Sequence, residues 1–272
     1  MAYFKYKEYD IYYDVKGSGK PIVLLNGIMM STLSWEPFVN SLMQNNTLIR
    51  LDFIDQGKSS KVDFNYTHEI QIEVLKALLD HLNLKQVNLV GISYGSEVAL
   101  GFTIKYQDYV DRLLLFNTAA YTSSWLKEIG RSWIKAGKTN DPEAYYKTAI
   151  PIIYSQEFYE ANSEWLKQRE SLLIDIFKNK DFINAMERLT LSSESYNVVN
   201  EVSKINIPTL IVSAENDYLT PKENQEELHK LIKTSHLVHI PNCSHASMYD
   251  KPLIFISLIL GFINTADVSF KI

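Results

Sequence analysis

Residues 87–106 read VNLVGISYGSEVALGFTIKY, and this stretch decides the fold. Its first part, 87–92, is a mostly apolar run of strand length, and 97–106 has the character of a helix. Between them, Gly91-Ile92-Ser93-Tyr94-Gly95 matches G-x-S-x-G, the pattern of a serine on a sharp turn between a strand and a helix. Glycines at both ends keep side chains out of the crowded turn. We therefore expect Ser93 to project from a strained turn as a nucleophile.

Similar apolar runs recur on both sides of this stretch. Those of strand length are 21–25, 48–53, 113–116 and 209–212. Runs without polar alternation are typical of parallel strands that helices cover on both faces. The clearest helical pattern lies at 70–82, where apolar residues are spaced along one helix face and Thr67 is the predicted N-cap. This alternation predicts an α/β fold with a mostly parallel, doubly wound sheet, whose ligand site lies beyond the carboxyl ends of the strands.

Two segments depart from the alternation. Residues 3–6 and 11–15 are short, aromatic and β-branched, and they predict an N-terminal antiparallel hairpin at a sheet edge. Beyond the strand at 113–116, apolar residues recur at helical spacing without a convincing strand, which predicts an inserted helical cap. The predicted units are a core of residues 1–118 and 205–272 and a cap of residues 119–204.

Composition limits the partners of the chain. A net charge of −5 and a pI near 5.7 give no positive field that would collect nucleic acid or anionic lipid. The longest apolar stretch, 253–263, has 11 residues, against the ~20 that cross a bilayer, so we expect a buried helix and no membrane span. Cys243 is the one cysteine and the start lacks a signal-peptide core, so we expect a cytoplasmic protein. A homodimer is left open, and residues 264–272 are expected to fray.

With its hairpin, its strand–serine–helix turn and its insertion, the chain resembles the α/β-hydrolase superfamily over the full length. The resemblance implies a catalytic triad in the order serine, acid, histidine. Asp217 follows the strand at 209–212 by a few positions, where the triad acid of this superfamily usually lies, and Glu215 is its local rival. His245 lies in the loop after the last predicted strand and is the expected general base.

The same resemblance implies an oxyanion hole made by two backbone N–H groups. They belong to Tyr94, directly after the nucleophile, and to Ile28, in the early loop. Most relatives have His-Gly where this chain has Asn26-Gly27, and an asparagine can supply a hydrogen bond that holds the loop. Three residues that follow this loop are expected to line the pocket, and ordinary packing is the equal alternative for each. They are Met29, Met30 and Trp35.

Residues 52–60 read DFIDQGKSS and contain Gly-Lys-Ser, the end of a phosphate-binding loop. That motif needs a glycine at position 52 and a helix directly after it, and neither is present, so we expect no ATP binding. The segment is similar instead to the D-x-x-G-x-G-x-S loop of the superfamily, and we expect it to support the floor of the site. Together with Asn26-Gly27 it also resembles, locally, the acyltransferases that join two hydroxyacyl chains in rhamnolipid synthesis.

These residues predict a serine hydrolase that cleaves a small to medium, mostly uncharged carboxylic ester. Ser93 would attack the carbonyl, His245 would take its proton, and Asp217 would hold the imidazole. The reaction requires no cofactor, and the sequence offers no metal-ligand spacing. The alternatives are an acyltransferase with the same triad, a carbon–carbon bond hydrolase, a lactonase, and a ligand-binding protein without activity. The cap residues expected to bind substrate are Trp125, Tyr145, Tyr146 and Trp165.

Overall fold

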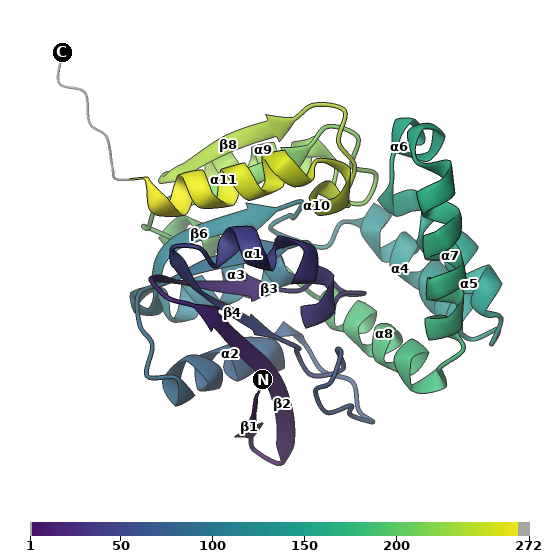
Figure 1. Ribbon diagram of the computed structural model, residues 1–272, viewed down its shortest axis with the longest axis horizontal. Coiled ribbons are helices and arrows are strands. Elements are labelled where there is room, and N and C mark those ends of the chain that lie inside the picture. Colours follow the sequence, from purple (N-terminus) through teal and green to yellow (C-terminus); the bar gives the residue numbers. More distant parts are fainter. Residues whose placement is uncertain (1, 266–272) are drawn as a thin grey trace.

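The computed structural model describes residues 2–265, and an eight-stranded sheet forms its centre (Figure 1). The strands are β1 (Ala2–Tyr6), β2 (Tyr9–Gly17), β3 (Lys20–Leu25), β4 (Asn46–Leu51), β5 (Val87–Ile92), β6 (Val110–Phe116), β7 (Thr209–Ala214) and β8 (Ser235–Ile240). Their order across the sheet is β1-β2-β4-β3-β5-β6-β7-β8. β2 runs antiparallel to β1 and β4, and the remaining pairs are parallel. The predicted hairpin and mostly parallel sheet are confirmed.

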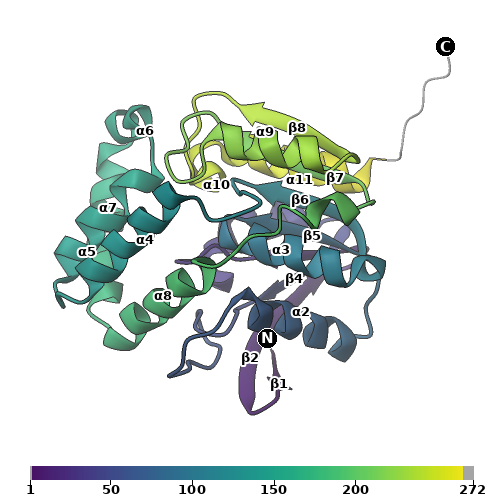
Figure 2. The same cartoon turned by 180° about the vertical axis from the view of Figure 1, so that it is seen from behind.

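Helices cover both faces of the sheet (Figures 1 and 2). On one face lie α2 (His68–His81), α3 (Tyr94–Lys105) and α9 (Lys222–Leu231), and on the other α1 (Val39–Leu42), α10 (Ser247–Asp250) and α11 (Pro252–Asn264). Successive side chains of a strand point to opposite faces. Accordingly, Leu89 of β5 enters the core under α2 and α3, whereas Val90 enters the core under α11. A strand buried on both sides therefore needs the unbroken apolar run that the sequence shows.

Helix α2 illustrates how closely a local pattern can define an element. It begins at His68, directly after the predicted N-cap, and the Thr67 hydroxyl accepts a hydrogen bond from the Glu69 N–H. Val74, Leu75 and Leu78, which supply the helical spacing, are fully buried. By contrast, the sequence analysis assigned no element to the 3₁₀ turn η1 (Thr32–Phe38) or to α1, which are short and lack several turns of periodicity.

Five helices lie between β6 and β7, and we refer to them as the inserted helices. They are α4 (Ser124–Gly137), α5 (Pro142–Ala149), α6 (Gln156–Ala161), α7 (Ser163–Phe177) and α8 (Lys180–Ser193). Short 3₁₀ turns also occur at η2 (Gln107–Tyr109), η3 (Pro151–Ile153) and η4 (Val202–Lys204). The inserted helices form a layer of their own beyond the carboxyl ends of the parallel strands (Figures 1 and 2). The Arg188 guanidinium on α8 donates hydrogen bonds of 2.7 and 2.8 Å to the Asp55 carboxylate, which ties this layer to the loop after β4.

The apolar stretch at 253–263 lies in α11, where Phe255, Ile259 and Ile263 are buried against the sheet. Within residues 2–265, no helix combines the length and the apolar character that crossing a bilayer requires. The expectation that the end of the chain frays concerns residues 264–272, of which 266–272 lie outside the described residues.

Candidate active site

Ser93 occupies the sharp turn between β5 and α3. Its backbone has φ 53° and ψ −122°, a conformation that L-residues rarely adopt. A Cβ built on Gly91 would lie 2.6 Å from the Gly95 carbonyl oxygen, and one on Gly95 would collide with the carbonyl oxygen of Leu25. The turn can therefore form only with glycine at both positions, and it holds the Ser93 side chain out from the ends of β5 and α3.

His245 and Asp217 meet at the ends of neighbouring strands. His245 follows β8, Asp217 follows β7, and the His245 Nδ1–H donates a 2.7 Å hydrogen bond to Asp217 Oδ2. The Asp217 carboxylate is fully buried and also accepts the N–H groups of Leu219 and Thr220 and the Thr220 hydroxyl. Every lone pair that points into the protein thus has a donor, as a buried carboxylate requires.

The rival acid lies elsewhere. Glu215 is exposed, and its carboxylate accepts the backbone N–H of Asn242 at 2.8 Å. The loop that carries His245 is held from another side by Asn117, whose amide donates a 2.6 Å hydrogen bond to the His245 carbonyl. Asn117 follows β6 with φ 51°, and the sequence analysis missed it. Its position at the end of a predicted parallel strand was the signal that could have pointed to it.

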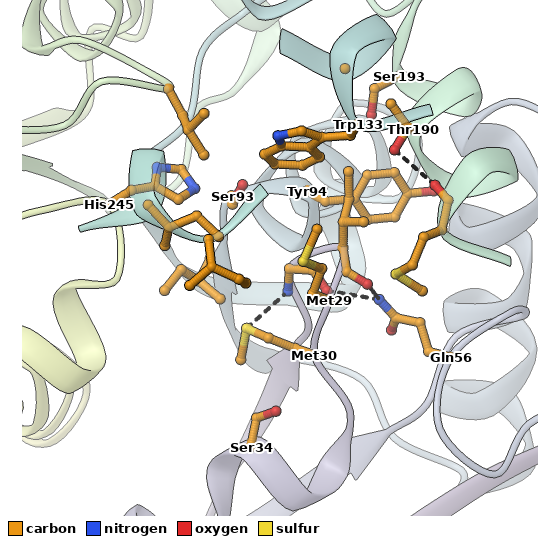
Figure 3. Close-up of a pocket in the computed structure, with 18 of the residues that line it drawn as sticks. Met29, Met30, Ser34, Gln56, Ser93, Tyr94, Trp133, Thr190, Ser193 and His245 are labelled. Atoms are coloured by element: carbon orange, nitrogen blue, oxygen red, sulfur yellow. Dashed lines mark hydrogen bonds between the residues drawn. The ribbon is translucent and has the colours of Figure 1, made fainter. Parts of the chain in front are cut away.

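Ser93 and His245 line the same cavity, and Figure 3 shows the serine hydroxyl and the imidazole facing one another. They come from β5 and β8, which are not neighbours in the sheet. The carboxyl ends of parallel strands share one edge, so residues distant in sequence converge there. Ser93, His245 and Asp217 thus have an order that could pass a proton from a serine to a histidine oriented by a carboxylate.

The early loop that carries Ile28 passes close to the nucleophile. A Cβ built on Gly27 would lie 3.7 Å from Ser93 Cβ. The Tyr94 N–H is in the first turn of α3, where backbone donors have no partner within the helix. Together, the N–H groups of Ile28 and Tyr94 are the backbone donors next to Ser93 that could stabilise an oxyanion.

Asn26 holds this loop through three hydrogen bonds. Its amide donates to the Leu51 carbonyl at 2.9 Å and to Gln56 Oε1 at 3.0 Å, and its oxygen accepts the Trp35 indole N–H at 2.6 Å. Trp35 was expected to line the pocket, and the structure corrects this. The side chain is fully buried between the sheet and α11, and its one polar group is used to hold Asn26.

The loop at 52–60 has the structural role that the sequence suggested. The Asp52 carboxylate accepts the N–H groups of Thr32 at 2.6 Å and Lys58 at 2.9 Å, and the Ser59 hydroxyl donates to the Asp52 carbonyl. Gln56 connects this loop to the early loop that carries Ile28. Its amide donates to the carbonyls of Gly27 at 2.8 Å and Ile28 at 3.2 Å (Figure 3), so it braces the early loop directly.

The cavity next to Ser93 has a volume of about 590 Å³ and is mostly apolar. Met29 and Met30 line it from the early loop, as expected, and Trp133 lines it from α4 (Figure 3). Other apolar residues that line the cavity come from the inserted helices and from η3, and they are Leu126, Ile129, Ile153, Leu173 and Met186. A volume of this size suits a small-molecule ligand.

The four aromatic residues predicted to bind substrate from the cap lie outside this cavity. Trp125 is 54% exposed and donates its indole N–H to the Tyr218 carbonyl. Tyr145 packs edge-on against Phe177, and Tyr146 borders a separate hollow of about 240 Å³. Trp165 packs against Tyr154 and Phe158 rather than lining the cavity.

The error with these aromatic residues has a structural cause. Composition does not say how each inserted helix is rotated about its axis, and only one face of each helix reaches the cavity. On α4, Trp125, Ile129 and Trp133 follow one another at intervals of four residues, but only Ile129 and Trp133 line the cavity. Trp125 lies at the exposed beginning of the helix, before the cavity lining starts at Leu126. Because Trp125 and Trp133 have the same spacing from Ile129, spacing alone could not have selected Trp133 from the sequence.

His68, to which the sequence analysis gave no role, lies beneath the site. Its Nε2 contacts Glu97 Oε2 at 2.7 Å, and its ring stacks on Tyr94 with centroids 4.6 Å apart. Glu97 and Ser193 line the cavity, and the Ser193 hydroxyl donates to the same carboxylate at 3.2 Å. Among residues 2–265 there is no group of three or more His, Cys, Asp and Glu side chains that could hold a metal ion.

Known proteins share this fold over nearly the whole chain. The chain matches the crystal structure of MGS-M2, an alpha/beta hydrolase enzyme from a Medee basin deep-sea metagenome library, with 45% identity, a TM-score of 0.98 and complete coverage of both chains. It is 23% identical to the 2-hydroxy-6-oxo-6-(2'-aminophenyl)hexa-2,4-dienoic acid hydrolase of Metapseudomonas resinovorans, over 93% of this chain and 87% of that protein. It is 26% identical to the proline iminopeptidase of Lactobacillus acidophilus, over 95% and 96% of the two chains.

By their names, the last two proteins are hydrolytic enzymes with different substrates. A family model described as alpha/beta hydrolase fold matches residues 20–252, which include Ser93, Asp217 and His245. The match covers the sheet from β3 onward and the inserted helices. The chain therefore belongs to the alpha/beta hydrolase fold family, a family of hydrolase enzymes.

Proposed function

We propose that the protein is a serine hydrolase that cleaves a small to medium carboxylic ester through an acyl-enzyme on Ser93. The observation that carries the proposal is the 2.7 Å hydrogen bond between His245 and the buried Asp217, in a cavity where the imidazole faces Ser93. A histidine held in this way has Nε2 free to accept the serine proton. The strained turn at Ser93 adds support, because such strain is found at functional sites.

In the proposed reaction, Ser93 Oγ attacks the ester carbonyl carbon while its proton passes to His245 Nε2. Asp217 stabilises the imidazolium, and the N–H groups of Ile28 and Tyr94 stabilise the negative oxygen of the tetrahedral intermediate. The intermediate collapses when the alcohol leaves with the proton from His245. Water, deprotonated by His245, then attacks the acyl carbon, and release of the carboxylic acid returns the proton to Ser93.

The inserted helices supply the second part of the proposal. The proposed triad and both oxyanion donors lie outside residues 119–204, whereas Trp133 and other apolar residues of this segment line the cavity. We infer that residues 119–204 act as a cap that selects the acyl group without taking part in the reaction. Burial of the acyl chain would contribute about 0.8 kcal/mol per methylene.

The test combines labelling with turnover. A fluorophosphonate probe should modify the wild-type protein at Ser93, and mass spectrometry locates the modified residue. Ser93→Ala should abolish labelling and should lower the rate of p-nitrophenyl ester hydrolysis by about 10⁴-fold or more. Circular dichroism should show that the variant stays folded, since the glycines and not the serine side chain form the turn. Labelling retained in Ser93→Ala, or ester hydrolysis within tenfold of wild type, would refute Ser93 as the nucleophile.

A substrate panel separates the neighbouring reactions. It should contain p-nitrophenyl esters of increasing acyl length, a lactone, and proline p-nitroanilide, because a relative is named a proline iminopeptidase. A hydroxyacyl alcohol added to the ester assay competes with water for the acyl group, so the ratio of new ester to free acid compares acyl transfer with hydrolysis. Faster turnover of the esters than of the lactone and the anilide would support the proposal. Turnover of the anilide alone would replace the proposed esterase activity with a peptidase activity.

A further inference from the structure

Several charged side chains line the cavity, and most of them have partners. Lys61 donates to the backbone carbonyls of Gln56, Gly57 and Ser59, at 2.9–3.0 Å. Arg131 forms ion pairs with Glu128 and Glu194. These cations are already satisfied, so neither is available to a ligand without breaking an existing contact.

Arg169, on α7, differs from them. It lines the cavity, its Nε is buried, and that nitrogen has no hydrogen-bond partner. Over the described range 2–265, no carboxylate lies within 4 Å of its guanidinium. The adjacent Glu170 is paired with Lys147 at 2.5 Å instead. A buried guanidinium donor without an acceptor is costly, so it calls for an explanation.

Two aromatic rings fix where this cation lies. The guanidinium carbon of Arg169 is 5.2 Å from the Trp165 ring centroid and 4.7 Å from that of Tyr249. Burial raises the pKa of Tyr154 to about 12, and both the charge of Arg169 and a side-chain hydrogen bond with it oppose this rise, whereas the Arg169 Nε has no such partner. Tyr249 donates its backbone N–H to Ala246, the residue after His245. Arg169 thus lies on the His245 side of the cavity, with little freedom to move.

We propose that the substrate carries a carboxylate and that Arg169 binds it while the ester carbonyl lies at Ser93. This inference rests on the proposed function and replaces the expectation of a mostly uncharged substrate. Nε and a terminal nitrogen of a guanidinium can donate two parallel hydrogen bonds to one carboxylate. Lys61 and Arg131 are engaged elsewhere, and the planar fork of Arg169 matches a planar carboxylate, whose two oxygens can accept both hydrogen bonds.

Binding of a dicarboxylate tests the site without requiring turnover. Glutarate and adipate should bind the full chain in isothermal titration calorimetry, and Arg169→Met should weaken that binding by about 10- to 100-fold. Arg169→Lys, which keeps the charge but not the paired donors, should fall between the two. Arg131→Met is the matched control, because it removes a cavity arginine that already has carboxylate partners, and it should leave the affinity within about twofold.

The kinetic test compares esters that differ in one charge. Monoethyl hemiesters of succinate, glutarate, adipate and suberate are paired with ethyl esters of acyl chains of equal length that end in a methyl group. The wild-type protein should have a higher kcat/KM for one hemiester than for its neutral partner. Arg169→Met should lower this ratio by about 10- to 100-fold, with the change mainly in KM.

The outcomes separate the two proposals. Binding of glutarate or adipate that depends on Arg169, in a protein that the fluorophosphonate does not label, would overturn the proposed function and keep the carboxylate site. Labelling and neutral-ester turnover with the same hemiester ratio in wild type and Arg169→Met would overturn the carboxylate site alone. If Arg169→Met does not fold, wild-type affinity for glutaramide equal to that for glutarate would also overturn it.

Discussion

Gln56 joins the loop after β4 to the loop that carries the Ile28 N–H, and replacing it with methionine tests whether this contact positions an oxyanion donor. Its side chain makes three hydrogen bonds, to Gly27, Ile28 and Asn26, and it is buried. Methionine has a similar length and volume but offers neither the donor nor the acceptor. Gln56→Met therefore removes the polar contacts and leaves most of the packing.

The expected magnitudes follow from these contacts. Each neutral hydrogen bond contributes about 1 kcal/mol, and Gly27 keeps a second donor in the Met30 N–H. The free energy of unfolding should thus fall by about 2–3 kcal/mol. Loss of one oxyanion donor costs about 10²–10³ in kcat, so a donor that is displaced rather than removed should cost about 10- to 100-fold. KM should change little, because the donor acts mainly on the transition state.

The assay measures kcat and KM with p-nitrophenyl butyrate and stability by urea unfolding. Gln71→Met is the matched control. Gln71 is also fully buried, and its side chain exchanges two 3.1 Å hydrogen bonds with the Ile54 backbone. It also contacts the Tyr94 hydroxyl, but it has no hydrogen bond to Gly27 or Ile28. It should lose comparable stability, about 2 kcal/mol, and keep kcat within about threefold of wild type.

Two results would refute this reasoning. If Gln56→Met lost stability but kept kcat within about twofold of the control variant, the early loop would be held without Gln56. If both variants lost kcat equally, the effect would come from general loosening of the 52–60 loop. A loss of kcat confined to Gln56→Met would support the brace.

Further predictions concern the acid, metals and the cavity. Asp217→Asn should lower kcat by about 10⁴-fold, whereas Glu215→Gln should keep kcat close to wild type, since only Asp217 contacts His245. Steady-state kinetics measure both variants, and the opposite ranking would make Glu215 the acid. EDTA should leave ester hydrolysis unchanged, and inactivation that zinc reverses would contradict the proposed mechanism. Trp133→Ala should extend the longest accepted acyl chain, with about a fourfold gain in kcat/KM per added methylene, measured on a p-nitrophenyl ester series; an unchanged cutoff would remove Trp133 from the acyl site.

Features that depend on neighbours in the chain could be predicted from the sequence. The turn at Ser93 follows from two glycines between an apolar strand and a helix, and α2 begins next to its predicted cap, Thr67. The parallel sheet follows from strands that are apolar on both faces. Asp217 and His245 were proposed from the order of residues in a superfamily, and the structure brings them within 2.7 Å. Backbone propensity and strand order carry this information, so it can be read along the chain.

Only the tertiary structure decided which side chains share the cavity. Trp35 is used to hold Asn26, and Trp125 is exposed, whereas Trp133 lines the cavity, although all three are equally apolar in the sequence. The role of Gln56 likewise depends on hydrogen-bond partners that are distant in the chain. The role of Arg169 depends on a buried Nε that has no hydrogen-bond partner within residues 2–265. Rotation of each inserted helix and the closure of long loops are set by packing between distant segments, and that packing has no counterpart in local sequence.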